Sequence, residues 1–205
     1  MRRPSTGSRL AAYTDAVFAV IITIMVLELR PPEAPTFAAL LTLWPTFVSY
    51  VVSYLFIAII WINHHYLMGY VDAITLRLVW VNFAHLFCVS LLPFATAWIA
   101  RTELTAVPVI LYAALFVVTD GLYNVFEREI LRASSEVSRE VYRHARRRSL
   151  IALGLFAVAA ALALIQPLLG FGFICVALLL HLTPDAAPWN RRRPTATGRD
   201  RGPAA

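Results

Sequence analysis

Residues 10–29 read LAAYTDAVFAVIITIMVLEL, and this stretch decides the fold class. A helix of about 20 mostly apolar residues is long enough to cross the hydrocarbon core of a bilayer. Within the stretch only Asp15 and Glu28 carry charge, one near each end. No small-residue cleavage motif follows it, so we predict a membrane-spanning helix and not a cleaved leader peptide.

Five more apolar stretches follow, at about residues 37–63, 78–100, 104–126, 150–165 and 168–182. The last two are shorter than a full span, so they fit either tilted spans or a re-entrant pair. The chain is 60% hydrophobic with a mean hydropathy of +0.69, more apolar than soluble domains usually are. We predict an all-α integral membrane six-helix bundle over residues 1–187. A disordered, Arg- and Pro-rich cytoplasmic tail is expected over residues 188–205.

The arginines predict the orientation of the bundle. All 18 basic residues are Arg, and with the N-terminus inside, all but Arg30 and Arg101 fall in cytoplasmic segments. Positive charge concentrates on the cytoplasmic side of membrane proteins, so an even number of spans and two cytoplasmic termini in a cell membrane are expected. This placement argues against a nucleic-acid partner. We interpret the run Arg146–Arg148 as a topology anchor at the lipid headgroups, where contact with anionic lipid is the alternative.

The polar segment from Glu127 to Ser149 lacks Gly and Pro, and it contains acidic and basic residues three apart. Such pairs favour a solvated helix that continues the fourth span into the cytoplasm.

Two faces of the first span can be assigned from helical spacing. One face carries Val20, Thr23, Ile24 and Leu27, which the spacing alone would assign to packing. A stripe of Ala12, Ala16 and Ala19 would let another helix approach closely. Arg9 and Asp15 lie six residues apart, on different sides of the helix, so each is expected to reach a different neighbouring helix.

Polar side chains gather where the second span ends and the third begins: Trp61, His64 and His65, then Asn82 and His85. We interpret them as a network that locks helices together, with interfacial anchoring by tryptophan as the alternative. Neighbouring histidines on a helix point about 100° apart, so these are poor joint metal ligands, and no metal site is expected.

Asp120 and Asn124 are one turn apart in the fourth span. Their spacing allows a proton or ion site, although an inward-facing structural pair is favoured. The sequence contains none of the motifs GxGxxG, Walker A, GxSxG or HExxH, so we expect neither an enzyme nor a cofactor. The TVGYG filter of ordinary potassium channels is also missing.

One motif resembles that of a known family. Arg9-x-x-x-Tyr13-Thr14-Asp15 is similar to the R-x-x-x-F-S-D signature of the transmembrane protein 175 family, the potassium channels of lysosomes and many bacteria. The stretches from Trp61 to His65 and from Asn82 to Phe94 also resemble that family. The resemblance covers about residues 9–98.

This resemblance implies a homotetramer with the first helix of each of its four subunits lining the pore. It assigns the apolar constriction to Val20, Ile24 and Leu27, and a hydroxyl layer linked to potassium preference to Thr23. The implied partners are potassium ions, membrane lipid and three further copies of the chain. The alternative function is a secondary ion-coupled transporter that uses Asp120 and the histidines, although the hydropathy shows no inverted repeat.

Overall fold

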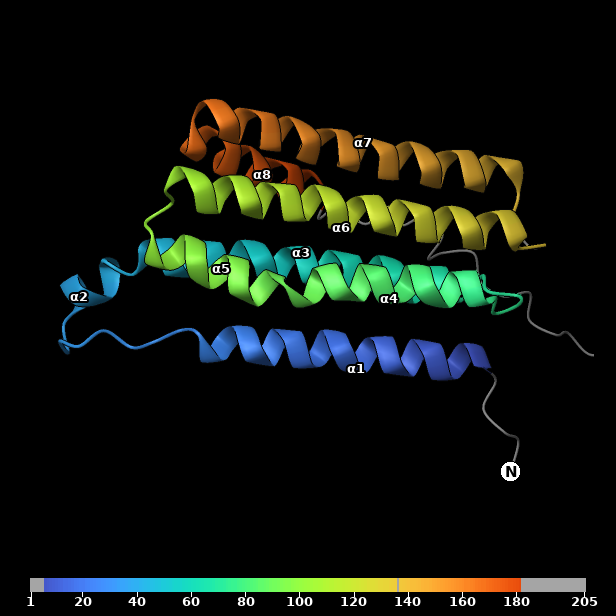
Figure 1. The fold of residues 1–205 in the computed structure, drawn as a ribbon, viewed down its shortest axis with the longest axis horizontal. Helices are drawn as coiled ribbons and strands as arrows, with labels where there is room; N and C mark the ends of the chain where they lie inside the picture. Colours follow the sequence, from blue (N-terminus) through green and yellow to red (C-terminus); the bar gives the residue numbers. More distant parts are fainter. Residues whose placement is uncertain (1–5, 136, 182–205) are drawn as a thin grey trace, which may run out of the picture.

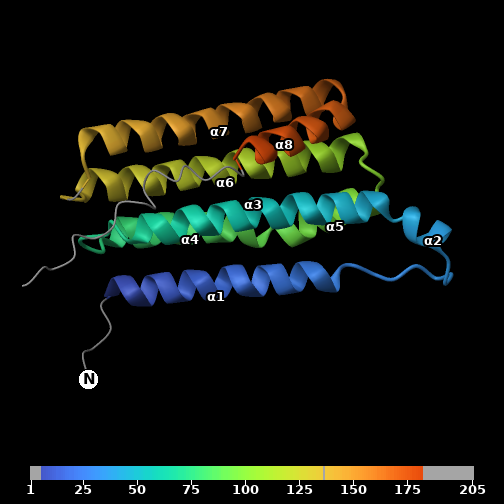
Figure 2. The ribbon, with the colours of Figure 1, turned by 180° about the vertical axis from the view of Figure 1, so that it is seen from behind.

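The computed structural model describes residues 6–135 and 137–181, and every regular element in them is helical. The elements are α1 (Thr6–Leu27), α2 (Phe37–Leu41), α3 (Trp44–Met68), α4 (Leu76–Ser90), α5 (Leu92–Arg101), α6 (Ala106–Ala133), α7 (Arg139–Ile165) and α8 (Pro167–His181). The long helices run along one axis. In this bundle α1 forms one edge, α3, α4 and α5 lie in the middle, and α6, α7 and α8 form the other side (Figure 1, Figure 2).

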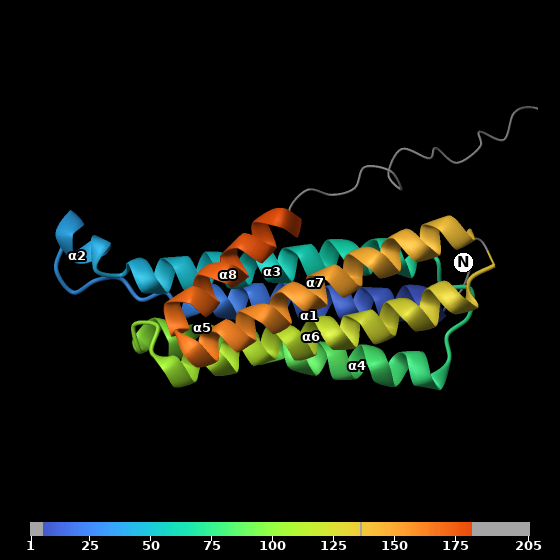
Figure 3. The same ribbon diagram turned by 90° about the horizontal axis from the view of Figure 1, so that it is seen from above.

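Five segments of the described chain are long and apolar enough to cross a membrane: Gly7–Leu27, Trp44–Met68, Leu76–Arg101, Ala106–Ala133 and Arg139–Ile165. The predicted all-α membrane fold is therefore confirmed. The sixth apolar helix, Pro167–Leu180, is shorter. Figure 3 shows α8 diverging at an angle from the end of α7 and stopping well before the end of the bundle where α7 begins. The count of six complete spans stays a prediction, and the predicted tail lies outside the described residues.

The second span begins later than the sequence pattern suggested. Residues 37–41 form the separate helix α2, which starts where the Thr36 hydroxyl accepts a hydrogen bond from the Ala39 amide. The helix α3 then starts at Trp44, with Pro45 in its first turn. Proline has no amide hydrogen and fits only that part of a helix, so the apolar run is divided before it. Pro93 divides the third span into α4 and α5 in the same way.

The prediction of one solvated helix across residues 127–149 is wrong. The helix α6 does continue to Ala133, but α7 starts afresh at Arg139. Serines produce the break, because their side chains compete with the helix for backbone partners. Ser138 caps α7 by accepting from the Val141 amide, and the amide and hydroxyl of Ser135 both donate to Asp72.

The turn between α7 and α8 depends on close backbone approach. A Cβ atom added to Gly170 would lie 2.5 Å from the Cβ of Ala163, so only glycine fits there.

Farther inside, three aromatic rings fill the centre of the bundle. Phe56 stacks on Phe116 with ring centroids 3.8 Å apart, and Phe156 meets both rings edge-on. The centre of the described bundle is therefore filled with side chains.

Candidate functional site

The helix α1 has one buried side and one exposed side. Phe18, Ile21 and Met25 point into the bundle and are almost fully buried. On another side, Val20, Ile24 and Leu27 leave 55%, 45% and 78% of their surface exposed. The sequence spacing placed these last three residues on one face, and the structure leaves that face largely uncovered by the rest of the described chain.

Thr23 is also exposed, and it is the polar residue among the four assigned to that face. Its hydroxyl donates to the backbone oxygen of Val20 at 2.8 Å, one turn earlier. This bond uses the hydroxyl hydrogen and leaves a lone pair of the oxygen available. Thr23 can therefore offer a cation an oxygen ligand without breaking a hydrogen bond.

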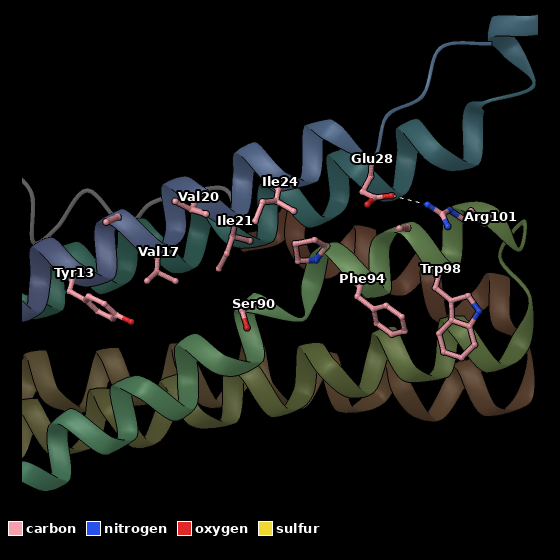
Figure 4. Close-up of a pocket in the computed structure, with 13 residues that line it drawn as sticks. Tyr13, Val17, Val20, Ile21, Ile24, Glu28, Ser90, Phe94, Trp98 and Arg101 are labelled. Carbon is pink, nitrogen blue, oxygen red and sulfur yellow. Dashed lines mark hydrogen bonds and ion pairs between the residues drawn. The ribbon is translucent and has the colours of Figure 1, made fainter. Parts of the chain in front are cut away.

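A groove of about 760 Å³ runs between α1 and the pair α4 and α5 (Figure 4). Its α1 wall includes Val17, Val20 and Ile24, and Phe94 and Trp98 of α5 stand opposite. The groove is closed at one end by an ion pair between Glu28 and Arg101. The middle of α1 is thus only loosely covered on this flank.

Near its N-terminal end, α1 is held by polar contacts to α3 and α4. The indole of Trp61 donates to Asp15 at 2.9 Å. The Asn82 amide nitrogen donates to the Thr14 hydroxyl at 2.9 Å, and its oxygen lies 3.0 Å from Nε2 of His64. Because an amide oxygen only accepts, His64 must carry its hydrogen on Nε2. These five side chains join three helices through two neighbouring sets of hydrogen bonds.

The other residues of the predicted network lie around it. His85 is buried one turn after Asn82, and its Nδ1 donates to the backbone oxygen of Thr119 on α6. His65 is exposed and lies against Trp61, apart from His64. Tyr13 packs on Phe83 of α4. Arg9 is exposed, and the described residues show no ion pair between it and Asp15.

The structure contains two polar clusters that the sequence did not predict in full; the first was not predicted at all. Ser53 bonds to both Thr96 and Tyr112 at 2.7 and 2.6 Å, which ties α3 to α5 and α6. Single hydroxyls in apolar spans give little signal of this kind.

The second cluster joins α6 to α7. Arg146 approaches Glu127 at 3.7 Å and also donates to Asn124, and the Ser149 hydroxyl donates to Glu127. Asp120 belongs to it through Asn124, whose amide donates to the carboxylate at 3.2 Å, and both side chains are buried, so the predicted inward-facing pair is confirmed. The sequence placed Glu127 in the polar segment after the fourth span and so gave no signal of this cluster, whereas the structure buries Glu127 inside α6, where a carboxylate needs a partner. Within residues 6–135 and 137–181, no three His, Cys, Asp or Glu side chains are grouped as a metal ion would require.

Comparison with known proteins relates this chain to potassium channels. Residues 9–93 match the family model described as "Endosomal/lysosomal potassium channel TMEM175". A potassium channel of Chryseobacterium sp. strain P1-3 is 34% identical over 88% of this chain and 94% of its own length. A potassium channel of Chamaesiphon minutus is 27% identical over 86% of this chain and 93% of its own.

The fold agrees with these relatives. The crystal structure of a lysosomal potassium-selective channel TMEM175 homolog from Chamaesiphon minutus matches with a TM-score of 0.80 and 26% identity, covering 87% of this chain and 97% of that one. An all-helical membrane bundle with this likeness has the fold of a potassium channel. The chain belongs to the TMEM175 family. Nothing in these comparisons supports the ion-coupled transporter.

Proposed function

We propose that this chain conducts potassium across the cell membrane, as a homotetramer in which four copies of α1 surround one pore. The exposed, uncharged face of α1, in a chain of a family whose relatives are named potassium channels, carries the proposal. The interior of each subunit is filled by Phe56, Phe116 and Phe156. An ion path must therefore run between subunits. The proposed role is conduction and not catalysis.

In this arrangement the exposed residues of α1 form stacked rings. Val20, Ile24 and Leu27 would give three apolar rings about one helical turn, roughly 5.4 Å, apart. A narrow apolar ring excludes water and so opposes the passage of a hydrated ion. Thr23 would add a ring of hydroxyl oxygens among them, and oxygens can replace part of the water that a potassium ion loses.

Contact between subunits is assigned to the stripe of Ala12, Ala16 and Ala19, all exposed on α1. Small side chains let membrane helices approach closely enough for strong van der Waals packing. Native mass spectrometry of the detergent-purified protein should show tetramers. A spectrum with only monomers or dimers would rule out this assembly.

The proposed orientation places both termini in the cytoplasm. Arg30 and Arg101 lie in the segments predicted to be outside, and the remaining arginines fall in those predicted to be inside. Within the run at residues 146–148, Arg146 donates a hydrogen bond to Asn124 and forms an ion pair with Glu127, whereas Arg147 is exposed. Arg147 is therefore the member of this run that is placed to meet lipid headgroups.

The direct test is ion flux from liposomes that contain the purified protein. With a potassium gradient, a protonophore and a pH-sensitive dye, we expect rapid flux that needs no second coupled ion. The same vesicles loaded with sodium should show slower flux, and vesicles without protein should show none. Absence of flux from assembled tetramers would refute conduction, and flux that depends on a second ion would favour a transporter.

A further inference from the structure

Glu28 and Arg101 form an ion pair at the end of the bundle away from the N-terminus (Figure 4). Glu28 directly follows Leu27, the last residue of α1, and Arg101 is the last residue of α5. Arg101 Nη2 lies 2.9 Å from Glu28 Oε2, with 64% and 42% of the two side chains exposed. The pair therefore links the end of α1 to α5 while both charges stay accessible.

Glu28 is the carboxylate that adjoins the proposed constriction along the chain. Between residues 16 and 28 of the chain it is the only charged residue. Among the residues that line the groove, Glu28 and Arg101 are the charged ones, and Arg30 joins them around a smaller adjoining cavity of about 120 Å³. Glu28 is thus the carboxylate that lines these cavities, where Arg30 and Arg101 oppose its attraction for a cation; Glu33 and Glu103 lie in the loops at the same end and line neither cavity.

We propose that Glu28 raises the cation concentration at the outer mouth of the pore, and that Arg101 limits this effect by pairing with it. The inference rests on the proposed function, because only four copies of α1 around an axis bring four Glu28 side chains to one mouth. Carboxylate rings attract cations in channels. Such charges act over about 30 Å at 10 mM salt but only about 3 Å at 1 M.

A purely mechanical role of the Glu28–Arg101 ion pair predicts a different result. If the ion pair only fastened α1 to α5, loss of either partner would loosen α1 in the same way. An electrostatic role gives the two substitutions opposite signs, since Arg101→Gln frees the carboxylates and Glu28→Gln leaves the arginines unopposed. The effects should also vanish at high salt, where the mouth charges are screened.

The experiment measures single-channel inward potassium conductance in planar bilayers at 10 mM and at 1 M KCl. At 10 mM we expect Arg101→Gln to conduct about two- to threefold more than the wild type, and Glu28→Gln to conduct less by a similar factor. At 1 M all three should agree. The matched control is Arg77→Gln, which breaks the Arg77–Glu129 ion pair, also 2.9 Å long, between α4 and α6. Its inward conductance should show the wild-type dependence on salt.

A charge-swapped protein, Glu28→Arg with Arg101→Glu, keeps the ion pair and puts the positive charge on α1. The inference predicts reduced conductance at 10 mM, whereas a mechanical role predicts the wild-type value. Equal changes in both single variants at both salt concentrations, or no change in either, would overturn the inference. Wild-type tetramers that pass no potassium would instead mean that the proposed function fails.

Discussion

The Thr23 side chain combines exposure with a hydroxyl whose hydrogen is already used by the Val20 carbonyl. Its oxygen can therefore face an ion without rearrangement. We expect Thr23→Ala to conduct but to discriminate potassium from sodium less well. A loss of about 0.5–1.5 kcal/mol corresponds to roughly two- to tenfold in the permeability ratio.

The measurement for Thr23 is the reversal potential under bi-ionic conditions. Thr23→Ser keeps the hydroxyl and should retain most of the discrimination. An unchanged reversal potential in Thr23→Ala would remove this residue from the selectivity site.

Substitutions at Ile24 and Val20 distinguish two explanations of the exposed apolar face of α1. If their rings gate a pore, Ile24→Asn or Val20→Ser should wet the path, raise flux and relax selectivity in an intact tetramer. If the rings are only packing, the same changes should weaken the tetramer and reduce flux. The control is Val26→Asn, which adds the same side chain at a comparably exposed position on another side of α1.

Single-channel recording of the Ile24→Asn protein decides between these explanations. Lower conductance from well-assembled tetramers would show that this face is not the gate.

At the scale of the elements, the amide of Asn82 joins α4 to α1 and α3. Asn82→Ala would leave the buried His64 and Thr14 side chains without these hydrogen bonds. Each unpaired buried polar group costs about 1–3 kcal/mol, so we expect a loss of roughly 2–4 kcal/mol in stability. Thermal unfolding in detergent measures it, and the control is Asn63→Ala, which removes a half-buried asparagine of α3 that lies outside these hydrogen bonds. A change below about 0.5 kcal/mol, typical of a neutral surface position, would contradict the structural role.

Arg146 and Glu127 connect α6 and α7 in a similar way. Their side chains are only 20% and 7% exposed, so removal of the arginine leaves a buried carboxylate without its charged partner. We expect Arg146→Met to lower stability by about 2–4 kcal/mol, somewhat less than for a fully buried pair. The double variant with Glu127→Gln should recover part of this loss, as measured by thermal unfolding. Arg147→Met removes an exposed neighbour and should have little effect, and equal losses from the two arginines would argue against the pairing.

For the molecule as a whole, the arginine distribution predicts the topology. Reporter fusions after Arg146 and after Arg193 should both report cytoplasm, and a fusion at Glu33 should report the outside. Arg193 lies outside the described residues, so this fusion tests the chain beyond α8. An external signal there would exclude an even number of spans and would show that α8 does not cross.

The sequence by itself determined the membrane class, the helical content and the faces of α1, because these depend on residues close together in the chain. The apolar stretches and the arginines that flank them indicate spans without knowledge of neighbours. Helix ends were less predictable. Whether a helix begins at Thr36, Pro45 or Ser138 depends on single residues that barely change the average hydropathy.

The tertiary structure alone decided which side chains meet. Asp15 and Trp61 are 46 residues apart, Glu28 and Arg101 are 73 apart, and each pair exists only because the helix order puts their elements side by side. The structure also separated the buried face of α1 from the exposed one. In a bilayer, packing, lipid contact and a dry pore all favour apolar side chains, so composition cannot tell these surroundings apart. Which surface the other helices leave uncovered is a property of the folded bundle.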